Sequence, residues 1–342
     1  MKKLNTIVAL IAGLFAFTSV QAGEMSVTGS MQATYQSEVD DITGNPLGMN
    51  TDLTFTGATD TDFGTATWTL ATDGTFLGDA GADHKLTLAT GVGTFKIGNS
   101  GDSANAIDDI TPTAFEEANG SGSGTYSTDF GSGMEGSMSL GYNLADVLGT
   151  GIAFDYTYYP KLDGSTNNEK AASADAGNAN KSAYSTNVKI PVANVPFVGG
   201  TALGGMTVTA GYEKSDGMNS TFQSKEGGTV AVNLPVGPLS LGYQKKAYAP
   251  VATANATKTF YKDDIYGIAY AFNDDLAISY NIYESAQHNN DGRNDKQETK
   301  AINIAYTVGG LTLALQEANT SNAGYVNATD DDTRTISIKT AF

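Results

Sequence analysis

Polar and apolar residues alternate along most of this chain, and that alternation constrains its fold more than any other feature. From Met25 to Tyr35, Met, Val, Gly, Met, Ala and Tyr occupy one phase, and Ser, Thr, Ser, Gln and Thr occupy the other. Successive side chains of a β-strand point to opposite faces, so such a segment has one apolar and one polar face. The pattern recurs down to Phe342, which predicts an all-β protein. The alternating segments are 25–35, 52–56, 65–70, 85–88, 95–97, 134–142, 152–158, 184–190, 206–212, 230–234, 239–243, 266–272, 276–282, 302–306, 311–315 and 336–342.

The connectors between these segments alternate between short and long. Residues 91–93 and 309–310 are short connectors, whereas 36–47 and 100–131 are long and polar. That asymmetry, with a consistently polar second phase and aromatic residues near segment ends, is typical of a barrel that spans a membrane around a wet lumen. Two chain ends on one side require an even number of strands, so we assign residues 124–130 to the third long connector or to the following strand. The expected fold is a transmembrane antiparallel up-and-down β-barrel of 16 strands.

The first 22 residues have the features of a cleaved export signal. Two lysines precede the apolar stretch 4–17, and Val20 and Ala22 are the small residues expected before a cleavage site. A transmembrane anchor is the alternative, but the stretch is shorter than the roughly 20 apolar residues that a helix needs to cross a bilayer. We therefore expect a signal peptide over residues 1–22 and a single barrel domain over 23–342.

Charge and composition argue against several classes of function. The 342 residues include 19 Lys and Arg against 37 Asp and Glu, a formal net charge of −18. Nucleic-acid binding needs a basic surface that neutralises phosphates, so we expect no nucleic-acid partner. The absence of cysteine excludes thiolate metal sites, and two histidines exclude mechanisms with several imidazoles. The sequence has no glycine-rich phosphate loop and no nucleophile elbow, and neither His84 nor His288 has a recognisable serine partner, so we expect no enzyme.

Three stretches resemble the general porins of the Gram-negative outer membrane. They are residues 27–35 (VTGSMQATY), 93–102 (GTFKIGNSGD) and 336–342 (ISIKTAF). The C-terminal Phe, with apolar residues two apart before it, resembles the recognition signal of outer-membrane proteins, although Thr340 departs from that series. The resemblance covers residues 23–342. It implies a 16-stranded barrel with an inward-folded third loop, a homotrimer in the outer membrane of a Gram-negative bacterium, and passive diffusion of small hydrophilic solutes.

The longest connector, residues 100–131, lies where porins fold their third loop into the lumen. It contains several acidic residues, no basic residue and a single proline, Pro112. Carboxylates in a narrow, water-filled passage raise the local concentration of cations. The alternative is that these acids are solvated loop charges without effect on ion flow. We expect a pore constriction that favours cations, and the residues that would form it are Asp102, Asp108, Asp109, Glu116 and Glu117.

Many porins line the wall opposite the third loop with arginines, and this chain departs from that pattern. Its two arginines, Arg293 and Arg334, fall near predicted outer ends. Lysines on the predicted lumen phase are the substitutes, although lysine lacks the planar, bidentate fork of arginine. The expected basic residues of the pore wall are Lys85, Lys96, Lys189 and Lys339.

Two other functions remain open from the sequence. A substrate-selective channel would need an aromatic slide or a basic ring inside the lumen, whereas most aromatic residues fall on the lipid phase. A secreted acidic β-protein that binds calcium is less favoured, because the repeats of that class are absent. We expect no cofactor. Acidic clusters in outer loops are weak candidates for structural calcium or for divalent bridges to lipopolysaccharide, and are more often only solvated. These clusters are Glu38, Asp40 and Asp41, and Asp330, Asp331 and Asp332.

Overall fold

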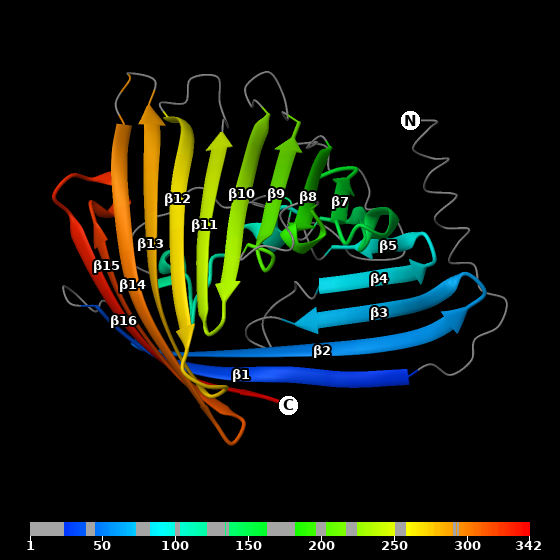
Figure 1. Cartoon of the computed structure of the whole chain (residues 1–342), viewed down its shortest axis with the longest axis horizontal. Helices are drawn as coiled ribbons and strands as arrows, with labels where there is room; N and C mark the ends of the chain where they lie inside the picture. The colour runs from blue at the N-terminus through cyan, green and yellow to red at the C-terminus, as the bar shows by residue number, and fades with distance from the viewer. Residues whose placement is uncertain are drawn as a thin grey trace.

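The strands form one closed ring. In the computed structural model of the chain, the described residues are 24–38, 45–72, 83–99, 103–121, 134, 137–162, 182–195, 203–216, 224–249, 258–289, 292 and 294–342. Sixteen strands pair antiparallel in chain order, and the last pairs with the first (Figure 1). The predicted up-and-down barrel of 16 strands is therefore confirmed. Residues 1–22, the expected signal, and residues 124–130 lie outside the described part.

The elements of the ring are strands joined by turns, with a few short 3-10 helices in the connectors. Among the residues that the structure describes, no helix is long and apolar enough to cross a membrane. The strands are β1 (Glu24–Glu38), β2 (Leu47–Thr61), β3 (Gly64–Thr72), β4 (Asp83–Thr90), β5 (Gly93–Gly98), β6 (Ser139–Leu144), β7 (Ala153–Tyr159), β8 (Ala183–Pro191), β9 (Thr207–Ser215), β10 (Lys225–Val236), β11 (Leu239–Ala249), β12 (Lys258–Ala271), β13 (Leu276–Asn289), β14 (Asn294–Val308), β15 (Leu311–Ser321) and β16 (Asp330–Ala341). The 3-10 helices are η1 (Asn105–Ile107), η2 (Ala118–Ser121), η3 (Val147–Gly149), η4 (Val192–Asn194) and η5 (Ala323–Tyr325).

Both ends of the described chain lie at the side of the ring that carries the short turns. Glu24 opposes Ala58, close to the tight turn between β2 and β3. Gly29 and Phe342 exchange two backbone hydrogen bonds of 2.9 Å, which extend the β1–β16 ladder to the last residue. An even number of strands brings the two ends to one side, as the parity argument requires.

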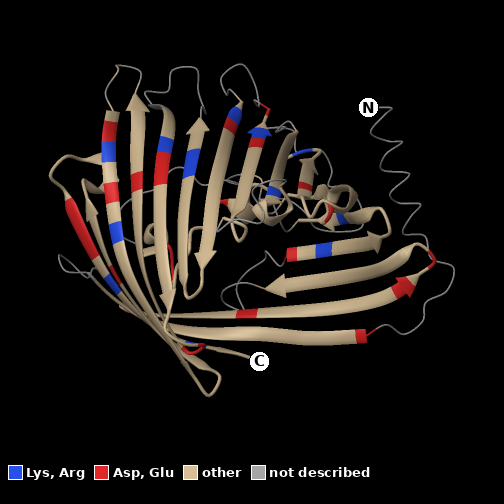
Figure 2. Ribbon diagram, viewed as in Figure 1, with Lys and Arg blue, Asp and Glu red and all other residues tan. Residues whose placement is uncertain are grey.

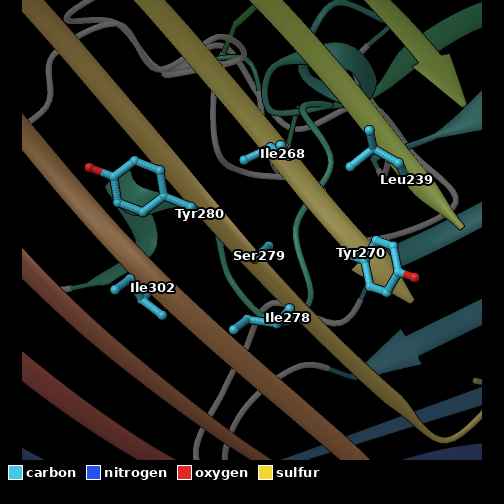
Figure 3. A pocket seen from close by; sticks show the side chains of 7 residues that line it. All are labelled: Leu239, Ile268, Tyr270, Ile278, Ser279, Tyr280 and Ile302. Carbon is cyan, nitrogen blue, oxygen red and sulfur yellow. The ribbon is translucent and has the colours of Figure 1, made fainter. Parts of the chain in front are cut away.

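The two faces of the wall differ, and β13 illustrates how. Ser279 is 3% exposed, and its Oγ accepts a hydrogen bond of 2.9 Å from the Ala114 amide of the β5–β6 connector. The residues on either side of it face the opposite way, into a hollow on the outer surface (Figure 3). A sheet protein that stays in water buries its large apolar side chains, whereas this barrel carries them outside. The residues around the hollow are Leu239, Ile268, Tyr270, Ile278, Tyr280 and Ile302.

Several strands run further than the apolar pattern predicts. β11 continues to Ala249, and β12 begins at Lys258, so much of residues 244–261 is strand rather than loop. Charged residues gather in these extensions, toward the long-connector side of the ring (Figure 2). Beyond the band of outward-facing apolar side chains, called the apolar belt below, both faces of a strand are polar. The alternation therefore disappears although the backbone ladder continues. The expected loops were therefore too long.

One expected lipid-facing residue is placed differently. The alternation predicts a strand that starts at Met134, but β6 begins only at Ser139. Met134 is 3% exposed and packs with Tyr159, Leu162 and Ala183. Tyr159 lies two residues after Thr157 and therefore on the same face of β7, and the Thr157 hydroxyl contacts the connector residue Ser103, so this cluster belongs to the inner face.

Candidate functional site

Residues 103–121 of the β5–β6 connector, called the 103–121 segment below, contact the polar face of strands around the ring. The Ser103 amide donates to Ser185 Oγ on β8 at 3.0 Å. At the other end, the Ser121 carbonyl accepts a hydrogen bond of 3.0 Å from Gln36 Nε2 on β1. Between them the segment meets β13 through Ser279. A single stretch of chain thus follows the polar face from β8 round to β1.

Carboxamide side chains of the strands hold the backbone of this segment. Each donates its amide hydrogen to a segment carbonyl, and polar backbone groups withdrawn from water need such partners. None of these donors ionises, so the attachment they provide is independent of pH. The group, called the amide belt below, comprises Asn187 to the Ser103 oxygen (2.5 Å), Gln244 to Ile107 (2.9 Å) and Asp108 (2.5 Å), Asn233 to Ile110 (2.7 Å), Asn281 to Pro112 (3.0 Å), Gln316 to Glu116 (3.0 Å) and Glu117 (3.3 Å), and Gln36 to Ser121 (3.0 Å).

Glycines on the wall let the middle of the segment approach closely. A Cβ atom on Gly242 of β11 would overlap the Pro112 ring, and one on Gly267 of β12 would lie 2.7 Å from the Pro112 oxygen. Real Cβ atoms do not reach such distances, so a side chain at either position would push the segment away from the wall. These two glycines therefore leave the space against the wall that Pro112 occupies.

Lys246 is the basic residue that the aspartates of the segment meet. Its side chain is 0% exposed, and its Nζ lies 2.9 Å from Asp108 Oδ1 and 3.3 Å from Asp109 Oδ1. The Tyr283 ring lies 5.3 Å from the same ammonium, in range of a cation–π contact. Buried charges persist where they are paired with the opposite charge. Asp108, an expected residue of the constriction, is therefore the partner of a buried ion pair.

A second charged contact lies at the start of the segment. Ser103 Oγ donates to Asp155 Oδ1 at 2.5 Å, and Lys96 Nζ lies 2.6 Å from the other oxygen of this carboxylate. Lys96 thus faces inward, as the alternation predicts. Because its ammonium is opposed by Asp155, it is not an isolated positive charge of the wall.

Solved structures of outer-membrane proteins, porins among them, have this architecture. The chain has 12% identity to an OmpT of Vibrio cholerae described as the trimer form, with a TM-score of 0.63 over 94% of this chain and 100% of that one. OmpF of Salmonella typhi in complex with daunomycin is 14% identical, with a TM-score of 0.64 over 94% and 98% of the two chains. An anion-selective porin of Comamonas acidovorans is 12% identical, with a TM-score of 0.65 over 94% and 100%.

The chain has the porin fold. No protein-family model matches its sequence, and no curated protein matches it either. At this level of identity the likeness concerns the fold alone.

Two carboxylates of the 103–121 segment differ from Asp108 in their surroundings. Glu116 and Glu117 are partly exposed and belong to none of the described ion pairs. Burial raises the pKa of both carboxyl groups, that of Glu117 to about 7, and the neighbouring charges of Asp109 and Glu116 raise the latter further. The positive charge of Lys339 acts on Glu116 in the opposite direction. Asp102, the other acid expected here, lies outside the described residues.

Three of the four expected wall lysines have ammonium groups without a described ion pair. Lys85, Lys189 and Lys339 lie on the inner face of the porin-fold barrel, and the described ion pairs of that face use Lys96 and Lys246 instead. Lys189 lines a hollow between the wall and Ile107, Ile110 and Pro112 of the segment. That these lysines form the basic wall of a pore stays a prediction.

Sequence reasoning missed Lys246 and the amide belt. Lys246 continues the polar phase of Ser240, Gly242 and Gln244, so extending the alternation beyond Tyr243 would have assigned it to the inner face. The amide belt had no such signal, because in the sequence an Asn or Gln that donates to a distant carbonyl cannot be distinguished from any other polar residue of the inner face. The inner tyrosines Tyr248, Tyr261, Tyr283 and Tyr325 were missed too, and since each is at most 8% exposed they do not form an aromatic slide.

The acidic clusters at the outer loops gather no metal-binding set in the part of the chain that the structure describes. Asp332 is hydrogen-bonded to Asn319 across the β15–β16 ladder. Within the described residues, no three or more His, Asp or Glu side chains are grouped to hold an ion. Asp40 and Asp41 lie outside the described residues, as does the side chain of Glu38.

Proposed function

We propose that this chain is a passive diffusion pore for small hydrophilic solutes and ions in the outer membrane of a Gram-negative bacterium, exported by the signal at residues 1–22. The observation that carries the proposal is the inversion of the wall. Ser279 faces the 103–121 segment, while Ile278 and Tyr280 beside it face outward. A closed sheet satisfies its backbone hydrogen bonds internally and leaves an apolar outside for lipid.

The 103–121 segment is the proposed constriction, in the role of an inward-folded third loop. A ring of 16 strands is wide enough to hold water, so a size limit requires something that narrows it. The contacts of the segment with β8, β13 and β1 support that role. We expect neither a cofactor nor an enzymatic activity.

Single-channel recording in planar bilayers and swelling of liposomes in graded sugars test the proposed pore. We expect discrete conductance steps, and swelling that slows sharply as the sugar becomes larger. Purified protein that folds into detergent micelles but gives no steps and no swelling would overturn the proposal. A protein that stays monodisperse without detergent would instead support the secreted acidic β-protein.

A mild preference for cations is a finer part of this proposal. Glu116 and Glu117 supply negative charge on the segment, whereas Lys246 compensates Asp108. The Comamonas porin is described as anion-selective on the same fold, so the sign of selectivity has to come from side chains and not from the barrel. The reversal potential under a KCl gradient measures it, and a value that favours chloride would overturn this part.

We also propose a homotrimer with contacts to lipopolysaccharide. The OmpT structure described as a trimer form supports the first part by analogy of fold. For the second, ion pairs such as Lys245–Asp264 (2.6 Å) and Arg334–Glu317 (2.6 Å) lie on the outer face beyond the apolar belt, where phosphorylated headgroups and divalent ions would meet them. Light scattering in detergent tests the trimer, and a monomeric mass contradicts it. Release of co-purified lipopolysaccharide by a chelator tests the divalent bridges.

A further inference from the structure

We propose that Lys246 is a positioning residue that fixes the 103–121 segment against the wall and compensates the charge of Asp108, so that this carboxylate adds little to the field that a permeating ion meets. The inference rests on the proposed pore function. It leaves Asp109, whose side chain is 26% exposed, together with Glu116 and Glu117 as the carboxylates of the described segment that act on ions.

β11, the strand that carries Lys246, binds the segment through two successive inward-facing side chains. Gln244, two residues earlier, is 0% exposed and uses both ends of its amide. Its Nε2 donates to the Ile107 and Asp108 carbonyls at 2.9 and 2.5 Å, and its Oε1 accepts from the Ile110 amide at 3.1 Å. The Lys246 ammonium then reaches the carboxylates of the same turn. β11 therefore holds both the backbone and the charges of residues 107–110.

The same contact ties the two halves of the segment together. Asn119 Nδ2 donates to Asp109 Oδ2 at 2.8 Å, while the other oxygen of that carboxylate faces Lys246. Ala118, next to Asn119, packs with Tyr283, whose ring lies beneath the Lys246 ammonium. A change at Lys246 should thus be felt at η2 as well as at Asp108.

The difference in exposure explains the division of labour among the acids. The Asp108 side chain is 9% exposed and is bonded to a lysine that water does not reach. The field of a charge paired at 2.9 Å falls off as that of a dipole, so an ion elsewhere in the lumen feels little of it. Removal of the lysine leaves Asp108 and Asp109 without a compensating charge. Ions in the lumen then experience the negative charge of both carboxylates, or the segment moves away from the wall so that water solvates them.

The central experiment compares Lys246→Met with Lys245→Met. Lys245 is the adjacent residue on the outer face of β11, so it controls for loss of a lysine on this strand. The chain has no cysteine, so Ala118→Cys, at a position that is 1% exposed, introduces a single buried thiol in either background. We expect a water-soluble maleimide to label this thiol at least tenfold faster with Lys246→Met and at an unchanged rate with Lys245→Met. Equal labelling rates in the two backgrounds would overturn the positioning role.

The charge assignment is tested by reversal potentials at pH 8 under a KCl gradient. We expect Lys246→Met to shift the potential toward cation selectivity, because Asp108 then lacks its compensating charge, and Glu116→Gln to shift it toward anions. An unchanged potential for Lys246→Met would overturn the assignment.

A charge-balanced variant keeps the test usable if Lys246→Met does not fold. Lys246→Met with Asp108→Asn removes one positive and one negative charge together, and we expect it to fold and to retain the unsubstituted reversal potential. A large shift toward cations in this variant would contradict the proposal. If the unsubstituted protein forms no channels, the pore proposal fails, while thiol labelling still decides whether Lys246 positions the segment.

Discussion

Lys245 and Lys246 are adjacent in sequence and form ion pairs on opposite faces of β11. The Lys245 ammonium lies 2.6 Å from Asp264 on the outer face, and the Lys246 ammonium lies 2.9 Å from Asp108 on the inner face. Their side chains are 52% and 0% exposed. Solvent screens the outer ion pair and not the inner one, so the inner pair is the stronger electrostatic interaction.

The two lysines should therefore differ in their effect on stability. An exposed pair contributes about 0–1 kcal/mol, so Lys245→Met should change the free energy of unfolding by about that much. Breaking a buried pair costs roughly 3–5 kcal/mol, because it leaves an uncompensated buried charge, so Lys246→Met should cost in that range. Urea unfolding of the barrel in detergent, followed by tryptophan fluorescence, measures both. Equal losses would mean that the Lys246 pair is as well solvated as the outer one.

Substitution by arginine should be tolerated on one face of β14 and not on the other. Ile304 is 38% exposed on the outer face, within the apolar belt that we place in lipid. Ile304→Arg should therefore lower the free energy of unfolding by roughly 2–4 kcal/mol. Ala305 lies on the inner, polar face beside Ala277 and Ala314, where a charged side chain stays out of lipid, so Ala305→Arg should be mild. Equilibrium unfolding in lipid vesicles compares the two. A larger loss for Ala305→Arg would show that the faces are reversed.

Loss of one belt amide should loosen the 103–121 segment. Gln244→Leu removes the donor to the Ile107 and Asp108 carbonyls and the acceptor for the Ile110 amide. Each buried group left unsatisfied costs about 1–3 kcal/mol. We expect lower stability together with greater open-channel noise. The control is Gln287→Leu on β13, since Gln287 donates to Tyr261 rather than to the segment; comparable noise in this variant would contradict the role of the belt.

Ion selectivity should depend on pH close to neutrality. Because the pKa of Glu117 is raised to about 7, this carboxyl loses its charge as the pH falls from 8 to 6, and cation preference should fall with it. The groups around it are Asp109, Glu116 and Lys246. Reversal potentials at a series of pH values measure the effect, and Glu117→Gln should flatten the curve between pH 6 and 8. A persistent step in that variant would assign the titration to another group.

The raised pKa of Glu117 also has a consequence for stability. The unfolded chain releases this proton near the usual value of 4.5, before the folded barrel does. The contribution of Glu117 to stability therefore decreases as the pH rises from about 4.5 to about 7 and is constant above. Unfolding of Glu117→Gln beside the unsubstituted barrel isolates this contribution, and a difference that grows above pH 7 would contradict it.

Alternation was enough to predict the architecture, because the side chains of each strand have to satisfy two different solvents. Met31 on β1 and Ile338 on β16 follow the outer phase and are 42% and 48% exposed, while Ser337, next to Ile338 on β16, is 2% exposed. The parity of the chain ends then gave the number of strands. Both arguments depend on local sequence and simple geometry, so neither needed the tertiary structure.

The parts that could not be predicted depend on contacts between distant residues. Asn281 and Pro112 are 169 positions apart, and nothing near either residue indicates that one donates to the other. Lys246 lies in a stretch without apolar alternation, so it was assigned to a loop and the aspartates of the segment were left without a partner. Their ion pairs with Lys246 were not predicted for that reason.

The amide belt separates two properties that a channel could otherwise not vary independently. The side chains of the amide belt, which hold the backbone of the 103–121 segment, do not ionise, whereas Glu117 titrates near neutrality. Acidification of the surroundings would then change which ions cross without changing the largest molecule that fits. A bacterium that enters an acidic niche would keep the same molecular sieve while losing part of its discrimination between salts.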